Sequence, residues 1–512
     1  MNKFVRKVLV LVLFLVLTLG FSFAGTTQKV TGIPNASVKA ESTRQPPEGR
    51  TRSLIYRFQK ETGCRDCSVA VICRGEVSFY GEEEGLYQIG SMTKAFTALA
   101  VRKLISEEKL SMESNVSGYL PGFTAYYKGK KQEITVEQLL LMTSGYTNQE
   151  AVYPSAAPGM TLQDWVKSIS GKELQSLPGE EYAYSNVNYD LLGAIIEQAT
   201  GESYAEYMER EILEPLGLKN TYVHIPEKCD IIIPGSRLGY RQTFRYEIPV
   251  VEGRIPAGYF YSNAGDMARW LQIWLGTAED VPEEFRELIS ETKSELTAEG
   301  TYTSGWEVFP YAIGHSGGTP NYSSRIVFSE ENEIGVCVLT NLNVAASTDG
   351  LCNGIFQIMK GFEPEEIPTD VWTVFDKIFM FVSLAGAVMI VFHLCLKLRV
   401  GLTGSRSSKT EGNADGDQSH SLAASAGNSK NFVISKLRLA LLIAGGSISL
   451  ILLITVCIVM PLVFGAGLGE IAFTWAPVSF AGGLIFLGAD VLVVIMRLLV
   501  LLIKRRMLQP SL

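Results

Sequence analysis

Three long apolar runs near the end of the chain constrain its architecture more than any other feature. They begin at Ile378, Leu437 and Pro477, and each is long enough for a helix to cross a bilayer, which takes roughly 17–25 residues. Because the bilayer core offers no hydrogen bonds to the backbone, an isolated run of this kind must be helical. We therefore expect three transmembrane helices, over residues 372–398, 435–464 and 477–503.

The basic residues around these runs predict their orientation. Residues 399–434 are polar and flanked by Lys and Arg, and they are rich in Ser, Gly, Ala and Asn, which favours a flexible loop. Basic residues at 504–506 follow the third run, whereas residues 465–476 contain no Lys or Arg. The positive-inside rule then places the loop and the C-terminus in the cytoplasm, and residues 25–370 outside the cytoplasm.

The N-terminal residues support the same predicted orientation. Residues 1–24 combine a basic start, an apolar run over Val8–Leu19 and small residues at Ser22 and Ala24, which predicts a secretory signal peptide. An uncleaved anchor is the alternative. Residues 25–51 are polar with several prolines and read as a linker. The net charge of −8 argues against nucleic acid as a partner.

The segment between linker and membrane, residues 52–365, is long enough to bury a large core. Strands are predicted near both of its ends and helices between them, so the fold class is α+β, with a mixed sheet and a helical subdomain. A hairpin is expected around Arg74-Gly75, joining strands 68–73 and 76–80. Cys64 and Cys67 form a disulfide, half of a metal site or two thiols, and zinc is disfavoured because no second pair accompanies them.

The first candidate catalytic group lies in Gly90–Ala100, an apolar, Ala-rich stretch that predicts a helix. Ser91 and Lys94 are three residues apart and share one helix face. A serine hydroxyl needs a neighbour that takes its proton, and a lysine made neutral by burial can do so. The spacing alone is weak, because most such pairs lie on solvated helix faces.

Two further pieces could converge on Ser91. Tyr184 and Asn186 lie two apart after a turn, where the phenol could move a proton and the amide could hold Lys94 or a substrate amide. His315, Gly317 and Gly318 follow at a strand end, and the Gly318 N–H could join that of Ser91 as an oxyanion hole. The alternatives are an aromatic residue in ordinary packing and a histidine satisfied in a turn.

In this order, Ser91-Met92-Thr93-Lys94, Tyr184-Ser185-Asn186 and His315-Ser316-Gly317 resemble the three signatures of the penicillin-recognising serine hydrolases. The Tyr-x-Asn form is similar to the class C β-lactamase-like branch. The resemblance implies acyl transfer without a cofactor or metal. Ser91, Lys94 and Tyr184 would be catalytic, and the substrate and oxyanion would be bound by Asn186, His315, Gly317 and Gly318.

One residue departs from the family pattern. His315 stands where many members carry a lysine that looks like an anchor for a substrate carboxylate. A mostly neutral imidazole is a weaker anchor, which favours a peptidase or esterase over a true β-lactamase. The whole layout resembles membrane-anchored peptidases that remove an N-acyl-D-amino-acid cap, of the colibactin-maturation type.

Several alternatives stay open. The substrate is a small molecule, a peptide or a peptidoglycan-like acyl compound, and the reaction is that of a peptidase, an esterase or a D-alanyl-D-alanine carboxypeptidase. A non-catalytic peptidoglycan- or β-lactam-binding sensor is the competing class. Asp490 lies well inside the third apolar run, where a charged group suggests a role. We expect it to join helices, through Ser447 or Ser449, and a site for a substrate or partner is the alternative. The sequence sets no oligomeric state.

Overall fold

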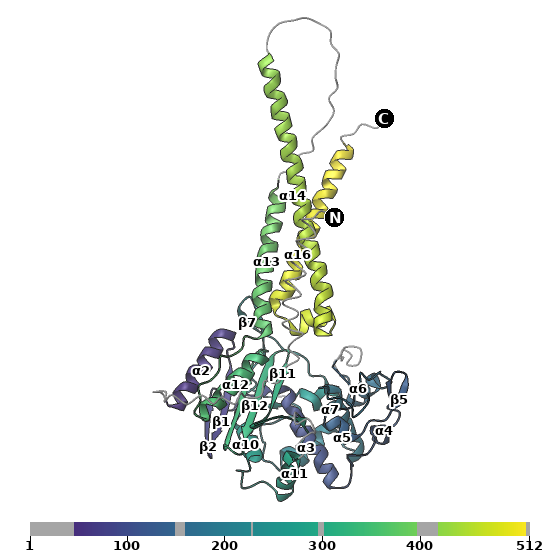
Figure 1. Cartoon of the computed structure of the whole chain (residues 1–512), viewed down its shortest axis with the longest axis vertical. Coiled ribbons are helices and arrows are strands. Elements are labelled where there is room, and N and C mark those ends of the chain that lie inside the picture. Colours follow the sequence, from purple (N-terminus) through teal and green to yellow (C-terminus); the bar gives the residue numbers. More distant parts are fainter. Residues whose placement is uncertain (1–45, 149–158, 227–228, 295–301, 397–417, 508–512) are drawn as a thin grey trace. The chain divides into compact units, whose positions relative to one another are not determined.

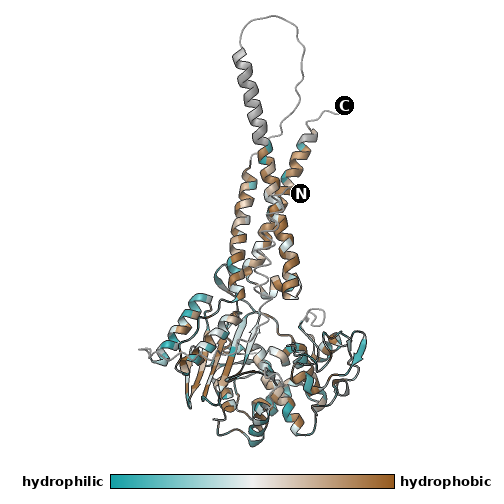
Figure 2. Cartoon of the chain, viewed as in Figure 1, coloured by the Kyte–Doolittle hydropathy of each residue, from teal (hydrophilic) through white to brown (hydrophobic). Residues whose placement is uncertain are grey.

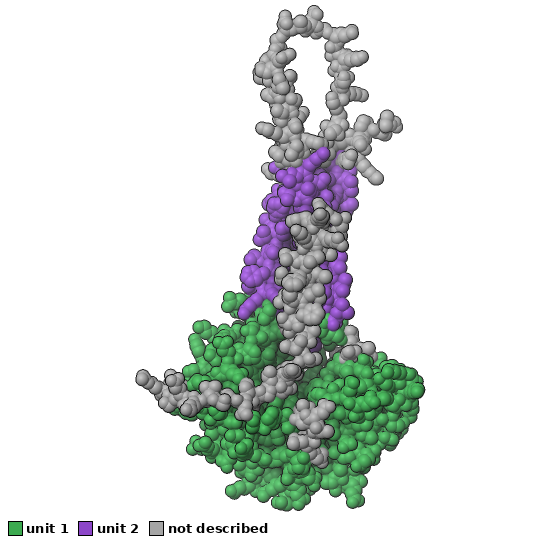
Figure 3. Space-filling model, viewed as in Figure 1, with its two compact units in different colours: residues 1–374, 463–470 green, residues 375–462, 471–512 purple. Residues whose placement is uncertain are grey.

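The computed structural model describes residues 46–148, 159–226, 229–294, 302–396 and 418–507. The chain divides into two compact units (Figure 3), the first formed by residues 1–374 with 463–470 and the second by residues 375–462 with 471–512. The expected signal peptide over 1–24 lies outside the described residues, as does most of the expected linker.

A seven-stranded sheet forms the centre of the first unit (Figure 1), in the order β2-β1-β13-β12-β11-β10-β9. Its neighbouring strands all run antiparallel, and parallel pairing is limited to isolated bridges elsewhere. The expected hairpin is confirmed as the first two strands. The strands are β1 (Cys67–Cys73), β2 (Glu76–Tyr80), β9 (Tyr302–Thr303), β10 (Trp306–Phe309), β11 (Ala312–Thr319), β12 (Tyr322–Ser329) and β13 (Ile334–Thr340).

The two ends of this unit meet in the sheet, because β1 pairs with β13 from Cys67 opposite Thr340 to Cys73 opposite Ile334. Helices α2 (Pro47–Thr62) and α12 (Ala345–Met359) cover one face, and α10 (Ala264–Leu275) covers the other. Helix α2 begins inside the expected 25–51 linker, so the linker prediction is wrong at its end. Pro47 occupies the first helical turn, where its missing N–H costs nothing.

The helical part of the unit lies between β2 and β9 in sequence, so the α+β class is confirmed. Its first long helix, α3, directly follows a 3₁₀ turn, η1, that contains Ser91. The helices are η1 (Gly90–Met92), α3 (Thr93–Ser106), α4 (Val116–Tyr119), α5 (Val136–Leu140), α6 (Leu162–Ile169), α7 (Asn186–Thr200), α8 (Tyr204–Met208), η2 (Glu209–Leu213), η3 (Glu252–Arg254), α9 (Ile255–Gly258) and α11 (Glu283–Ser294). Three two-stranded ribbons complete it: β3 (Tyr87–Gln88) with β8 (Tyr261–Ser262), β4 (Ala125–Tyr127) with β5 (Lys130–Gln132), and β6 (Ser236–Gly239) with β7 (Gln242–Arg245).

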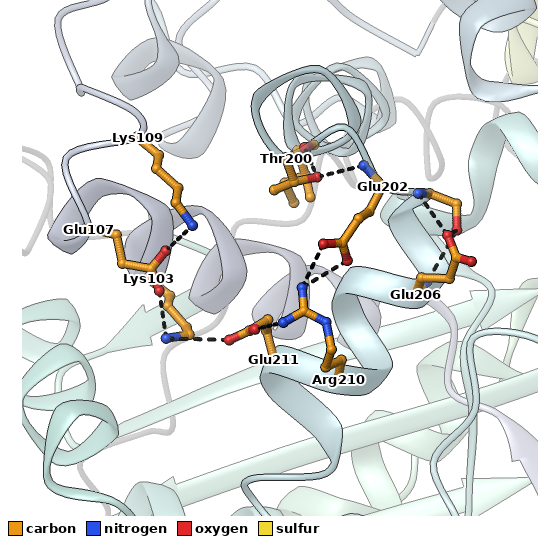
Figure 4. Close-up of polar contacts among 10 residues, drawn as sticks. Lys103, Glu107, Lys109, Thr200, Glu202, Glu206, Arg210 and Glu211 are labelled. Carbon is orange, nitrogen blue, oxygen red and sulfur yellow. Dashed lines mark hydrogen bonds and ion pairs between the residues drawn. The ribbon is translucent and has the colours of Figure 1, made fainter.

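An ion-pair cluster fastens the C-terminal end of α3 (Figure 4). The ammonium of Lys103 lies 2.7 Å from the carboxylate of Glu107, 3.6 Å from that of Glu211 and 3.5 Å from that of Glu284, and its side chain is 8% exposed. Because Glu211 belongs to η2 and Glu284 to α11, one buried cation joins three helical segments.

The second unit consists mainly of apolar helices (Figure 2). Three of them are long and apolar enough to cross a membrane, over Val371–Cys395, Lys436–Phe464 and Val478–Lys504. The expected loop over 399–434 is wrong in its second half, where α14 already begins at Gln418. The helices of the second unit are α13 (Val371–Cys395), α14 (Gln418–Phe464), η4 (Ile471–Trp475) and α16 (Val478–Met507), whereas α15 (Leu468–Glu470) belongs to the first unit.

Candidate active site

Ser91 lies in the η1 turn immediately before α3, which places it at the N-terminal end of that helix. The turn is held by Thr93, whose hydroxyl donates to the Gly90 carbonyl at 2.7 Å and accepts from the Phe260 N–H at 3.2 Å. Backbone N–H groups at a helix N-terminus favour negative charge. Ser91 is therefore presented where a developing oxyanion is stabilised.

Lys94 lies one turn further along, with Nζ 3.0 Å from Ser91 Oγ. Its side chain is 0% exposed, and the amine donates to Asn186 Oδ1 at 2.7 Å and to the Ala257 carbonyl at 2.5 Å. Burial lowers the pKa of Lys94 to about 7, and the more distant charge of Asp190 opposes that shift in part. The expected Ser91–Lys94 pair therefore forms, with an amine that can be neutral near pH 7.

The second motif converges on the same point from the start of α7. Asn186, the first residue of that helix, accepts a hydrogen bond from the Lys94 amine. This contact corresponds to the first of its two expected roles, which were to hold Lys94 or a substrate amide. The Tyr184 ring lies 5.0 Å from Lys94 Nζ. Among the described residues the Tyr184 hydroxyl has no hydrogen-bond partner of good geometry. Burial raises the pKa of Tyr184 well above its usual value, and the nearby Ser91 hydroxyl offsets part of that effect.

His315 lies in the middle of β11 and is 1% exposed. Its ring centroid is 6.0 Å from that of Tyr184 and 5.9 Å from that of Tyr302. Nδ1 lies 2.6 Å from the Ser316 carbonyl, which can only accept, so this nitrogen carries the proton. Burial lowers the pKa of His315 to about 4, so the ring is neutral at neutral pH and offers no positive charge.

Glycines bring the third motif close to Ser91. Gly90 has φ +52°, and a Cβ built on it would lie 2.4 Å from the Gly318 nitrogen. A Cβ on Gly317 would lie 2.1 Å from the Ile89 carbonyl oxygen. The backbones of the η1 turn and strand β11 are therefore in direct contact. The Gly318 nitrogen lies beside the turn that contains Ser91, as an oxyanion hole formed by the N–H groups of these two residues requires.

A polar network supports β11 from the α12 side of the sheet. The Ser316 hydroxyl donates to Asp349 Oδ1 at 2.9 Å, and Arg325 Nη1 donates to Ser316 Oγ at 2.6 Å and to Glu307 at 2.7 Å. Burial raises the pKa of Asp349 to about 6. The Arg325 guanidinium is thereby engaged with Ser316 and Glu307.

Sequence reasoning missed several of these participants. Ala257 contributes a backbone carbonyl, for which no side-chain pattern exists. Asp190 stands four residues after Asn186 on α7, and that helical spacing was an available signal. Tyr302 and Asp349 reach the site through sheet pairing and helix packing over long sequence separations, which a single sequence does not reveal.

The other candidate groups form no second site. Cys64 and Cys67 are buried free thiols, and burial raises the pKa of both, that of Cys67 to about 12, which disfavours the nucleophilic thiolate form. Among the described residues, no cluster of three or more His, Cys, Asp or Glu side chains is arranged to hold a metal ion.

Comparison with known proteins shows which family this sequence matches. The family model described as "Beta-lactamase" matches residues 51–353. "Protein flp" of Staphylococcus aureus strain MW2 is 34% identical over 278 residues, which cover 50% of this chain and 53% of that protein. The "Putative penicillin-binding protein PbpX" of Bacillus subtilis strain 168 is 26% identical over 274 residues, 53% of this chain and 66% of that protein. The chain thus spans about half the length of flp.

Solved structures share the fold. The octameric penicillin-binding protein homologue from Pyrococcus abyssi superposes with a TM-score of 0.55 at 25% identity, covering 65% of this chain and 81% of that one. A class C beta-lactamase gives a TM-score of 0.54 at 18% identity, covering 65% of this chain and 99% of that one. The resemblance of the first unit's fold to this group of structures is therefore confirmed.

Proposed function

Because the chain belongs to the Beta-lactamase family, we propose that it is a serine hydrolase that acts through an acyl-enzyme at Ser91. The observation that carries this proposal is the 3.0 Å approach of the buried Lys94 amine to the Ser91 hydroxyl. In a neutral amine the two N–H bonds donate to Asn186 and to the Ala257 carbonyl, which leaves the nitrogen lone pair for the Ser91 proton.

The reaction follows from these positions. Ser91 Oγ attacks the substrate carbonyl carbon while its proton passes to Lys94. The N–H groups of Ser91 and Gly318 bind the oxyanion, an interaction worth about 2.7–4 kcal/mol per donor in enzymes where it was measured. Tyr184 passes a proton to the leaving group, since its hydroxyl is buried beside Ser91 and makes no hydrogen bond of good geometry among the described residues. Water then attacks the acyl-enzyme with the same groups acting in reverse.

The third motif, His315-Ser316-Gly317, and the strand that carries it indicate which class of substrate could bind. Its His315 is neutral, and Arg325 is held by Glu307, so neither offers a free cation for a substrate carboxylate. Strand β10 pairs with β11 only as far as Gly314, and Ser316–Thr319 extend beyond it. An extended peptide can add to such a strand edge. These features support a peptidase or amidase acting on D-amino-acid-containing or N-acyl peptides.

Three other functions remain in the proposal as alternatives. An esterase is favoured by the same neutral His315, because ester substrates need no carboxylate anchor. A D-alanyl-D-alanine carboxypeptidase would require another cation to hold its substrate's terminal carboxylate. A non-catalytic peptidoglycan- or β-lactam-binding sensor would use the same pocket for stable acylation without turnover.

We place the catalytic unit outside the cytoplasm, anchored in the cell membrane by α13, α14 and α16, with the C-terminus in the cytoplasm. The support is the composition of the three apolar helices and the basic residues around 399–434 and 504–506. Accessibility of a cysteine placed at residue 508 in intact and permeabilised cells tests this orientation.

The central test uses the full chain beside its Ser91→Ala variant. Both are treated with a fluorophosphonate probe and then with N-acyl-D-amino-acid amides, D-Ala-D-Ala peptides, short esters and nitrocefin. We expect labelling and turnover of an amide or ester class that vanish in Ser91→Ala. Absence of labelling in the folded wild-type chain would overturn the enzyme proposal, and labelling without turnover of any substrate would favour the sensor.

A further inference from the structure

The membrane unit contains a buried polar centre that the hydrolase chemistry does not use. His393 of α13, Ser449 of α14 and Asp490 of α16 meet there, one residue from each apolar helix. His393 Nδ1 lies 2.7 Å from Asp490 Oδ1, and the Ser449 hydroxyl donates to Asp490 Oδ2 at 2.8 Å. His393 and Asp490 are 0% exposed and Ser449 is 4% exposed.

The centre lies deep within the apolar helices. In the span Val478–Lys504, Asp490 is twelve residues from the first residue and fourteen from the last, about 18 and 21 Å along the helix axis. Polar side chains at that depth are costly and usually face partners or a functional site. Ser447, the other expected partner, is exposed on α14, so the structure selects Ser449.

The same three residue types make hydrolytic triads, but this arrangement excludes that chemistry. In a triad the serine bonds to the histidine nitrogen remote from the carboxylate. Here Ser449 donates to Asp490 instead, and His393 Nε2 has no hydrogen-bond partner among the described residues. That nitrogen faces Gly445, where a Cβ would lie 2.5 Å from it, which leaves no room for a substrate.

The number of protons on the His393–Asp490 pair follows from the cost of burying a net charge there. Arg497, on the same helix as Asp490, donates instead to the carbonyl groups of Leu394 and Leu396 at the end of α13. No other charged group contacts the pair in the described part of the chain. A bare Asp490 carboxylate beside a neutral His393 would leave one net negative charge within apolar helices. A second proton on the His393–Asp490 pair removes that charge. Because one proton lies between His393 Nδ1 and Asp490 Oδ1, the second proton lies on His393 Nε2.

We propose that His393, Asp490 and Ser449 form an intramembrane proton-binding site that holds the three membrane helices together. The ligand is a proton, stored on the His393–Asp490 pair with Nε2 protonated. Close packing of the helices around these three residues supports such a clamp, by which we mean the contacts that hold the helices together. A Cβ on Gly445 would lie 2.5 Å from His393, and a Cβ on Gly446 would lie 2.8 Å from Val494. Small residues let membrane helices approach this closely.

Nitrogen-15 NMR of histidine in the full chain, in lipid nanodiscs at neutral pH, tests the proton content. The chain has four histidines, so the triple variant His224→Gln/His315→Gln/His420→Gln leaves His393 as the single signal. We expect a protonated Nε2. A bare, unprotonated Nε2 would overturn the proton site. This readout does not depend on hydrolase activity, so its failure is distinct from failure of the proposed function.

A matched pair of serine variants tests the clamp. Ser449→Ala removes the donor to Asp490, whereas Ser447→Ala changes an exposed serine two residues away on the same helix. In nanodiscs or mild detergent we expect Ser449→Ala, but not Ser447→Ala, to lower the thermal unfolding midpoint of the membrane helices. Asp490→Leu extends the test, with a larger expected loss. Equal stability of wild type, Ser449→Ala and Asp490→Leu would overturn the clamp.

Discussion

The Nζ atom of Lys94 lies 3.0 Å from the Oγ atom of Ser91, inside a site where the lysine side chain is fully buried. Burial lowers the pKa of Lys94 to about 7. Because the amine is a base only when unprotonated, kcat/KM should rise as the pH rises through about 7 and then level off. A pH profile of hydrolysis measures this limb.

The matched variant for this limb is Lys94→Ala. We expect it to lower kcat/KM by about 10²–10⁴, the usual contribution of a positioned general base, and to remove the rise near pH 7. Persistence of the same limb in Lys94→Ala would assign it to another group.

Tyr184 should matter most for poor leaving groups. Tyr184→Phe keeps the ring that packs near Lys94 and His315 but removes the hydroxyl that would protonate a leaving amine. We expect a loss of about 10²–10⁴ in kcat for amides and a smaller loss for activated esters, whose leaving groups need little protonation. Equal losses for both substrate types would contradict this role. Steady-state kinetics on an amide and ester pair with one acyl group measures the difference.

Gly90 should tolerate no side chain, for two reasons. Its φ of +52° disfavours other residues, and a Cβ would lie 2.4 Å from the Gly318 nitrogen. Gly90→Ala should displace that N–H from the oxyanion position and lower the rate of acylation by about 10²–10³. Gly118→Ala is the control, since a Cβ there meets no atom within 4 Å and the residue lies in α4, outside the site. Labelling rates with a fluorophosphonate report both variants, and a similar loss in the two would argue against the displaced donor.

The ion-pair cluster at the end of α3 predicts a stability difference between two nearby lysines (Figure 4). Lys103 is 8% exposed and faces three carboxylates, whereas Lys109 is 53% exposed and contacts Glu107 alone. Lys103→Ala should destabilise the first unit by about 1.5–3 kcal/mol, because three partly exposed carboxylates lose the one buried cation that joins them. Lys109→Ala should cost about 0–1 kcal/mol. Chemical denaturation of the full chain compares them, and equal losses would show that burial of Lys103 adds nothing.

Much of the fold could be predicted from local pattern. The turn at Arg74-Gly75 marks the first hairpin, and the apolar runs mark the three helices that are long and apolar enough to cross a membrane. The missed features are those without a local signal. Residues 418–434 are polar enough to read as a loop, yet they extend α14. Helices α6 and α11 were not foreseen because their periodicity lies among polar, loop-like segments.

The sequence by itself determined the order and identity of the chemical groups. A Ser-x-x-Lys spacing, a Tyr-x-Asn and a His-Ser-Gly-Gly are local facts, and so is the apolar character of the three long runs near the end of the chain. Only the tertiary structure decided what these groups do together. Burial lowers the pKa of Lys94 to about 7 and keeps His315 a neutral ring, and packing joins Asp490 to His393 and Ser449. The physical reason is that pKa values and hydrogen-bond partners depend on solvent exclusion and on contacts between residues far apart in the chain.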